Sequence, residues 1–213
     1  MTIDLIAPQV QDYMQSFVPP RPPEMQNMEE YAQKTGFPII GPAVGYLCYQ
    51  MARLIGARKV FELGSGYGYS TAWFALAVRD NGGGRVYHVV WDADLSQRAR
   101  EHLGAMGFED IVQYQVGEAV QALRAADGTF DLIFNDIEKP GYPASLPVIQ
   151  EKLRPGGVLI VDNMLWAGRI FDPGDQAAST QGVRQLAQQI SQSNAWIASL
   201  LPIRDGLLVA CKK

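Results

Sequence analysis

The fold is decided by the stretch Val60-Phe61-Glu62-Leu63-Gly64-Ser65-Gly66-Tyr67-Gly68-Tyr69-Ser70. It consists of a short apolar strand, a turn with glycine at every second position, and the start of a helix. Glycine lets the backbone turn tightly, so a ligand can lie against the main chain and the helix N-terminus. In open α/β sheets, such a turn lies at the carboxyl ends of the strands, near the point where the strand order reverses. The sequence therefore predicts a ligand site at this turn.

Short apolar segments alternate with helical segments from Lys59 onward. Strands are predicted over residues 60–63, 86–91, 111–115, 130–135 and 158–162. The helices between them are predicted to begin near Tyr69, Leu95, Glu118 and Ser145. Asp94 and Gln97 have the spacing of a capping box at the second of these helix starts. Buried strands that alternate with helices indicate a doubly wound, mostly parallel α/β sheet that is covered on both faces.

Both ends of the chain depart from this alternation. Near the C-terminus, residues 196–201 and 207–211 flank a turn at 202–206, which predicts an antiparallel hairpin. Before the first strand, helices are predicted after Pro8, over residues 24–35 and after Pro42. We therefore expect one domain over residues 1–213, with N-terminal helices in 1–57 and an α/β core in 58–213.

Composition limits the classes of function. The chain has 213 residues and a net charge of −4, so a general nucleic-acid or anionic-membrane footprint is not expected. Its two cysteines, Cys48 and Cys211, lack the spacing of a disulfide framework or a metal site. The N-terminus lacks the basic lead of a secretory signal, and the apolar runs are shorter than a membrane span. These features predict a cytoplasmic protein.

The glycine spacing and the residue before the first glycine indicate the cofactor. The pattern is G-x-G-x-G rather than the G-x-G-x-x-G of dinucleotide-binding proteins. Glu62 would be badly placed beside a pyrophosphate but well placed toward an ammonium group. S-adenosylmethionine (SAM) has an amino-acid end and no phosphate. The sequence therefore favours SAM over NAD.

Two clusters of polar residues follow predicted strands. Residues 134–139 read Phe-Asn-Asp-Ile-Glu-Lys, and residues 161–163 read Val-Asp-Asn. Asp136, Asp162 and Asn163 offer three oxygen ligands at one sheet edge, which favours Mg²⁺, Ca²⁺ or Mn²⁺ over Zn²⁺ or Cu²⁺. The alternative interpretation is that the two aspartates only cap the segments that follow them.

The residues quoted above resemble the cation-dependent O-methyltransferases, the family of catechol and caffeoyl-CoA O-methyltransferases and their small bacterial relatives. The similarity runs from about Met25 to residues 205–208 and is densest at 134–142 and 161–168. It implies a SAM-dependent methyltransferase fold whose N-terminal helices form part of a lid and often a homodimer contact. It also implies that Asp136, Asp162 and Asn163 bind a divalent cation, most simply Mg²⁺.

The resemblance implies roles for further residues. Lys139 corresponds to the family's proposed general base and acts with Asp136 in catalysis; a nearby cation is expected to lower a lysine pKa. The residues predicted to bind SAM are Ile40, Glu62, Gly64, Ser65, Gly66, Gly68, Ser70, Glu118, Ala119 and Asp136.

This sequence departs from the family at the ribose contact. The family ends its second strand with an acidic residue, whereas Val90 stands at the aligned position. Asp92 lies two residues further along, on the same side of the strand. Our hypothesis is that Asp92 replaces the missing ribose contact.

The predicted function is metal-dependent methyl transfer from SAM to a hydroxyl of a small catechol-like acceptor. A first alternative is methylation of a hydroxylated uridine in tRNA, against which the acidic composition argues. Further alternatives are a non-catalytic SAM-binding protein and an NAD(P)-dependent oxidoreductase.

Overall fold

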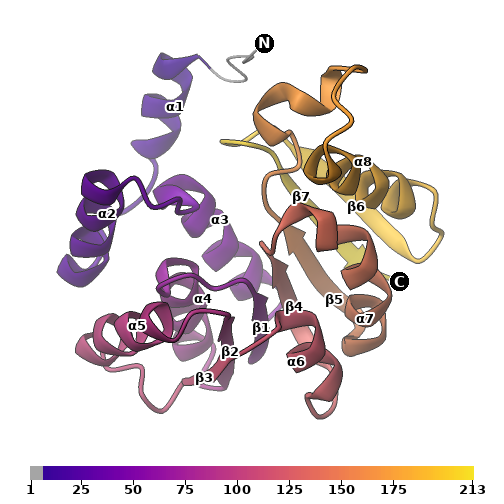
Figure 1. Cartoon of the computed structure of the whole chain (residues 1–213). Helices are drawn as coiled ribbons and strands as arrows, with labels where there is room; N and C mark the ends of the chain where they lie inside the picture. Colours follow the sequence, from indigo (N-terminus) through magenta and orange to yellow (C-terminus); the bar gives the residue numbers. More distant parts are fainter. Residues whose placement is uncertain (1–6) are drawn as a thin grey trace.

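The computed structural model describes residues 7–213, which form a seven-stranded sheet with helices on both faces (Figure 1). The first five strands are β1 (Lys59–Leu63), β2 (Arg85–Val90), β3 (Val112–Val116), β4 (Phe130–Asn135) and β5 (Leu153–Val161). They run parallel, and the full strand order is β3-β2-β1-β4-β5-β7-β6. The order therefore reverses between β1 and β4, and the glycine turn follows β1 at this switch point, as predicted.

The last two strands form the predicted antiparallel hairpin. β6 (Trp196–Leu201) pairs with β7 (Leu207–Lys212), and β7 pairs antiparallel with β5. In this register Val161, the last residue of β5, lies opposite Leu208. The turn at 202–206 therefore returns to the carboxyl end of β5.

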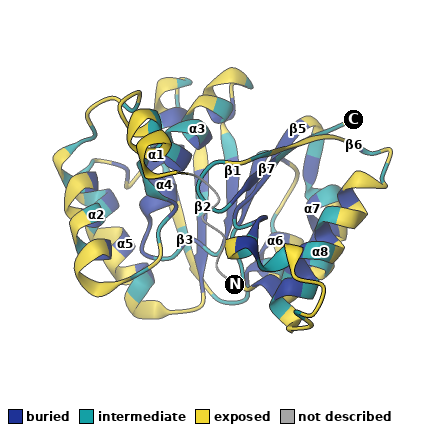
Figure 2. Ribbon diagram, turned by 90° about the horizontal axis from the view of Figure 1, so that it is seen from above, coloured by how far each residue is buried: buried dark blue, intermediate teal, exposed yellow. Residues whose placement is uncertain are grey.

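The helices form a layer on each face of the sheet, and the central strands between the layers are largely buried, whereas the edge strands are mostly exposed (Figure 2). One face is covered by α3 (Gly41–Leu54), α4 (Tyr69–Asp80) and α5 (Ala93–Ala105), with α2 (Pro23–Thr35) packed against α4 and α5. The other is covered by α6 (Ala119–Ala125), α7 (Tyr142–Lys152) and α8 (Ala178–Ser191). Each layer encloses its own cluster of buried apolar side chains. α1 (Pro8–Gln15) contacts α3 at the outer end of the first layer.

The start of α5 corrects one prediction. The helix begins at Ala93 rather than near Leu95, and its N-cap is Asp92, not Asp94. Asp92 Oδ1 accepts hydrogen bonds from the backbone N–H groups of Asp94 and Leu95, at 2.8 and 3.0 Å. The predicted capping box at Asp94 is therefore wrong, because Asp92 already satisfies the free N–H groups of the first turn.

Several other boundaries differ from the prediction. β5 begins at Leu153 instead of residue 158, because the backbone around the Pro-Gly-Gly sequence stays paired with β4 through a register shift. α7 begins at Tyr142 rather than Ser145, because the short 3-10 turn η1 (Lys139–Gly141) leads into it. β2 and β3 are each displaced by one residue. α8 is absent from the prediction, although three of its apolar side chains are buried at helical spacing: Val183, Leu186 and Ile190.

Residues 1–6, which carry most of the N-terminal segment considered for a secretory signal, lie outside the described residues. Within residues 7–213, none of the helices has the length and apolar character of a membrane-spanning segment.

Gly182 in α8 lets that helix approach the backbone that carries Lys139. A Cβ atom at Gly182 would lie 2.0 Å from the Lys139 carbonyl oxygen. We expect Gly182→Ala to lower the free energy of unfolding by about 1–3 kcal/mol, because the backbone must shift to relieve the collision. Urea denaturation would measure this loss.

The matched control is Gly104→Ala in α5. There the new Cβ meets only the end of the Glu109 side chain, at 3.4 Å. We expect this variant to be unchanged or up to about 1 kcal/mol more stable, because alanine favours the helix. Equal losses in the two variants would contradict the packing argument.

Candidate active site

The glycine turn is fixed by hydrogen bonds to the neighbouring strands. Ser65 N donates to the Val89 carbonyl at 3.0 Å, and Val89 N donates to Ser65 Oγ at 2.9 Å. On the other side, Asp136 N donates to the Leu63 carbonyl at 2.9 Å. Gly64 has φ +88°, and a Cβ there would lie 2.5 Å from the Asp136 carbonyl oxygen. Only glycine therefore fits at Gly64, and the Ser65 hydroxyl holds the turn against β2.

Two hollows lie on either side of this turn and share Gly64, Gly66 and Asp136 in their linings. The smaller one, about 40 Å³ in volume, is called the Ser70 hollow here and is bounded by the segment before α3 and the start of α4. The larger one, about 210 Å³, is called the Asp92 hollow and is bounded by the end of β2 and the start of α6. The predicted SAM residues that line one or both hollows are Ile40, Gly64, Ser65, Gly66, Ser70, Asp92, Ala119 and Asp136.

Three predicted SAM residues lie outside the linings of these hollows. Glu62 is fully buried in β1. Gly68 has φ +93°, and a Cβ there would lie 3.0 Å from Ala99 Cβ, so it lets α4 pack on α5. Glu118 caps α6, because its carboxylate accepts from the backbone N–H groups of Val120 and Gln121. Gly68 and Glu118 therefore have structural roles in this conformation.

Glu62 is a buried acid with an altered pKa. Burial penalises the charged carboxylate and raises the pKa to about 7, and the nearby Asp136 charge adds to this rise. The hydroxyls of Ser70 and Thr71 oppose the shift. Within residues 7–213, neither carboxylate oxygen has a hydrogen-bond partner of good geometry. A cationic group arriving above Glu62 would therefore find a carboxylate that has no ion-pair partner among the described residues.

The polar residues after β4 and β5 come together at the carboxyl ends of these strands. Lys139 Nζ donates to Asp136 Oδ1 at 2.8 Å and to the Ile137 carbonyl at 3.3 Å. The Asp162 side chain is 1% exposed, and burial raises its pKa to about 6, an effect that the Arg204 charge opposes and the Asp136 charge reinforces. The structure thus brings the predicted Asp136, Lys139 and Asp162 into one electrostatic cluster.

The turn between β6 and β7 adds two charged residues to this cluster. Arg204 Nη1 contacts Asp162 Oδ2 at 2.9 Å. Asp205 Oδ2 accepts from Asn163 Nδ2 at 3.1 Å, and Asp205 Oδ1 accepts from Ala167 N at 2.6 Å. Because the amide nitrogen of Asn163 donates to Asp205, the amide oxygen of Asn163 faces away from Asp205 and can accept from or bind another partner. Sequence reasoning assigned neither residue a role, although two charges at a hairpin tip beside β5 are a readable signal.

Aromatic rings enclose the amino group of Lys139. Its Nζ lies 5.2 Å from the centre of the Tyr142 ring and 5.6 Å from the centre of the Trp166 ring. Tyr142 Oη donates to the Asp162 carbonyl at 2.8 Å. These contacts hold the lysine beside Asp136, with only 9% of its side chain exposed.

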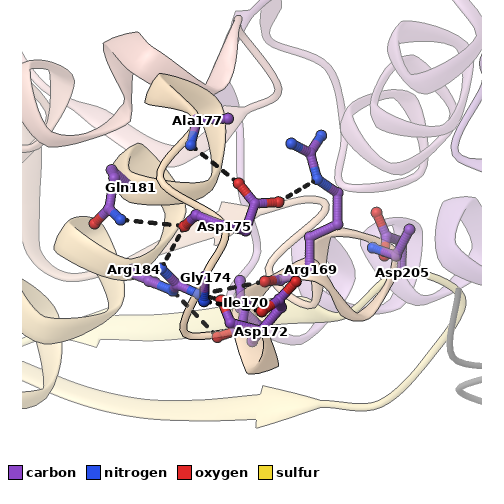
Figure 3. A network of polar contacts seen from close by, with 10 residues as sticks. Arg169, Ile170, Asp172, Gly174, Asp175, Ala177, Gln181, Arg184 and Asp205 are labelled. Carbon is purple, nitrogen blue, oxygen red and sulfur yellow. Dashed lines mark hydrogen bonds and ion pairs between the residues drawn. The ribbon is translucent and has the colours of Figure 1, made fainter. Parts of the chain in front are cut away.

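The loop after Asn163 is braced by a polar network (Figure 3). It contains the 3-10 segment η2 (Trp166–Phe171), in which Ala167 has φ +49°. Arg169 Nε contacts Asp175 Oδ2 at 2.7 Å, and Arg184 of α8 donates to the carbonyls of Ile170, Asp172 and Asp175. The network ties the loop to α8, and Asp205 anchors the same loop from the other side.

The oxygen atoms of this cluster suit a hard divalent cation. Asp136, Asp162 and Asn163 supply two carboxylates and one amide oxygen, and Asp162 Oδ1 is buried without a hydrogen-bond partner in the described chain. Within residues 7–213, no three His, Cys, Asp or Glu side chains gather as a metal cluster, so the amide would have to serve as the third ligand. Such a set fits Mg²⁺, Ca²⁺ or Mn²⁺, which keep several positions for water or another ligand.

Glu62 makes the stability of the ligand-free protein depend on pH. Its folded pKa of about 7 lies above the ordinary glutamate value of 4.5, so the folded state binds its proton more tightly. Relative to Glu62→Gln, the wild-type protein should be most stable below about pH 4.5. We expect it to lose about 3 kcal/mol of that relative stability as the pH rises through 7. Urea denaturation of both proteins across this pH range would measure the difference in their free energies of unfolding. A difference that does not change with pH would refute the raised pKa of Glu62.

Asp205 holds both Asn163 and the backbone of Ala167. Asp205→Ala removes both hydrogen bonds and should lower the free energy of unfolding by about 1–2 kcal/mol. Asp205→Asn keeps one amide oxygen as an acceptor, so we expect a smaller loss. Denaturation curves would rank the two variants, and an equal effect would show that the pair of acceptor oxygens is unimportant.

Comparison with known proteins identifies the family. The family profile described as O-methyltransferase matches residues 23–213. A catechol O-methyltransferase from Niastella koreensis is 29% identical over 191 residues, which cover 84% of this chain and 86% of that protein.

Two solved structures match nearly the whole chain. The O-methyltransferase TomG from Streptomyces achromogenes, which is involved in tomaymycin synthesis and was solved with SAM, is 26% identical with a TM-score of 0.86 over 96% of both chains. An O-methyltransferase from Bacillus cereus, solved with S-adenosylhomocysteine (SAH), is 25% identical with a TM-score of 0.87 over 96% of this chain and 97% of that one. The chain therefore belongs to the O-methyltransferase family and is a SAM-dependent O-methyltransferase.

Proposed function

We propose that this protein transfers a methyl group from SAM to a hydroxyl of a small catechol-like acceptor with the help of a bound divalent cation. The observation that carries the proposal is the convergence of Asp136, Asp162, Asn163 and Lys139 beside the hollows of the glycine turn. The acceptor class is supported by the catechol O-methyltransferase among the relatives.

In this proposal each of the two hollows holds one end of SAM. The amino-acid end would lie in the Ser70 hollow near Ile40, with its ammonium group above the buried Glu62. The adenosine end would lie in the Asp92 hollow near Ala119. Asp92 is available to the ribose hydroxyls, because only its Oδ1 is used to cap α5 and the Val90 side chain carries no polar atom. Glu118 would have to leave its cap to contact the adenine.

Asp136, Asp162 and Asn163 would hold the divalent cation through their side-chain oxygens. A bound cation would lower the pKa of an acceptor hydroxyl and so ease its ionisation. Asp205 fixes the amide of Asn163 so that its oxygen is free for this purpose. The oxygen ligands favour Mg²⁺, Ca²⁺ or Mn²⁺ over softer metals, and Mg²⁺ is the first candidate among these three.

Lys139 is the proposed general base. Its Nζ is held by Asp136, by the Ile137 carbonyl and between two aromatic rings. After losing a proton to solvent, the neutral amine would take the proton of the acceptor hydroxyl. The acceptor oxygen then attacks the methyl carbon of SAM in line with the sulfur. A carbon–oxygen bond forms, the carbon–sulfur bond breaks, and SAH leaves.

The surroundings of the site support a lid and a second protomer as parts of the proposal. α1 carries the exposed apolar side chains of Val10 and Tyr13, and Phe17 follows it. We propose that residues 1–57 close over the acceptor, that the chain works as one domain, and that α1 contributes to a homodimer.

Methyl transfer from SAM to catechol with Mg²⁺ tests the proposed function. We expect turnover that is abolished by a chelator, restored by Mg²⁺ or Mn²⁺, and reduced at least about a hundredfold in Asp162→Asn and Lys139→Met. Liquid chromatography with mass spectrometry would measure the methylated catechol.

The control is Asp110→Asn, which changes an aspartate in the exposed loop before β3 and should leave turnover unchanged. Calorimetric titration with SAM separates the steps, because both active-site variants should still bind SAM. Turnover that persists in a chelator would contradict the cation, and turnover with tRNA alone would contradict the small acceptor.

A further inference from the structure

A small cavity lies between α1, the start of α3 and the turn that joins β6 to β7. Its volume is about 90 Å³, and Met14, Val44 and Ile203 contribute to its largely apolar wall. A wider apolar groove of about 580 Å³ adjoins it along α1, and the two share Met14 and Ile203. Among the described residues that line either space, Arg204 is the only charged one.

Arg204 connects this cavity to the carboxylate cluster. Its guanidinium contacts Asp162 through Nη1, and a third of its side chain is exposed. A guanidinium has five N–H donors, and within residues 7–213 this contact is the one hydrogen bond that Arg204 donates. The remaining donors are therefore not used by any of the residues 7–213, and we expect them to reach a ligand in the cavity.

The other charged groups of the cluster do not compete for that ligand. Lys139 is 9% exposed, is paired with Asp136 and does not line the cavity. Asp205 uses both carboxylate oxygens on Asn163 and Ala167. An acceptor placed between the cavity and Asp162 would therefore meet a mostly apolar wall that also contains Gln11 and Gln15, and Arg204 as the one positive charge among the described lining residues.

The backbone at Arg204 is also unusual. Its φ of +50° lies in the left-handed region, which favours glycine. An arginine at this position is held in a strained conformation that aims its side chain at Asp162. Because glycine would fit this turn with less strain, the side chain itself is the reason to expect a function here.

We propose that Arg204 is a specificity-determining residue that selects acceptors carrying a carboxylate in addition to the hydroxyl that is methylated. The inference rests on the proposed function, because it assigns the acceptor of the same site. A planar carboxylate matches the donor fork of a guanidinium. The small volume and apolar wall of the cavity fit the ring of a hydroxylated aromatic acid.

The test compares 3,4-dihydroxybenzoate with 4-methylcatechol, which has the same vicinal hydroxyls and a methyl group in place of the carboxylate. Equilibrium binding of each to the complex with SAH and Mg²⁺ is measured by calorimetry, and kcat/KM is measured for each with SAM. The wild-type protein should prefer the acid by about 10- to 100-fold in both quantities, the range expected of a charge-assisted hydrogen bond.

Variants at Arg204 locate the preference. In Arg204→Gln the ratio of the affinities, and of the kcat/KM values, for the two acceptors should fall to about one, whatever the absolute activity. Arg204→Lys should keep part of the preference for the acid, because the charge remains. Arg53→Gln is the matched control, since it removes an arginine paired with Asp80 at the other end of α3, and its ratio should equal that of the wild type.

Several outcomes would overturn the inference. Wild-type protein that binds both acceptors equally, or binds neither, removes the basis for selection. A preference that persists in Arg204→Gln assigns it to another residue; if that variant does not fold, a wild-type ratio in Arg53→Gln with a reduced ratio in Arg204→Lys still supports Arg204. Selective binding of the acid without methyl transfer would sink the proposed function and leave the assignment of Arg204 intact.

Discussion

The antiparallel pairing of β7 with β5 is the constraint on which the candidate site depends. Because Val161 lies opposite Leu208, the hairpin turn is held at the point where Asp162 and Asn163 leave β5. Arg204 and Asp205 can contact these two side chains only in this register, since a slip of one residue would turn them to the other face. The terminal hairpin therefore belongs to the site as much as the glycine turn does.

Two aspartates of the cluster, Asp136 and Asp162, are each paired with a cation from a different part of the fold. Asp136 is paired with Lys139 three residues further along, whereas Asp162 is paired with Arg204 from the distant hairpin. The pair of Asp136 and Lys139 follows from their spacing in the sequence, whereas the pair of Asp162 and Arg204 depends on tertiary structure. Burial raises the pKa of Glu62, which has no such cationic partner among the described residues, to about 7, whereas the Arg204 charge opposes the same effect at Asp162. The site is thus held together by charge balance as well as by packing.

The sequence was sufficient to predict the parallel core, the hairpin and the cluster of Asp136, Lys139 and Asp162, because each follows from a local pattern of apolar strands and the residues after them. It was insufficient where long-range contacts decide. Whether Asp92 or Asp94 caps α5 depends on where β2 ends, and the start of β5 depends on pairing with β4 across a register shift. The partners of Arg204 and Asp205 lie about forty residues away, and no local spacing encodes them.

The cavity beside Arg204 has a consequence for the biosynthesis of this chain. The hollows around the glycine turn are lined by residues between Phe37 and Glu138. These residues have therefore emerged from the ribosome well before translation of the chain ends. The acceptor cavity joins α1 to residues near 204, and it can close only when the last strands have emerged. A nascent chain can therefore shape the proposed binding place of SAM while the proposed place of the acceptor is still unfinished.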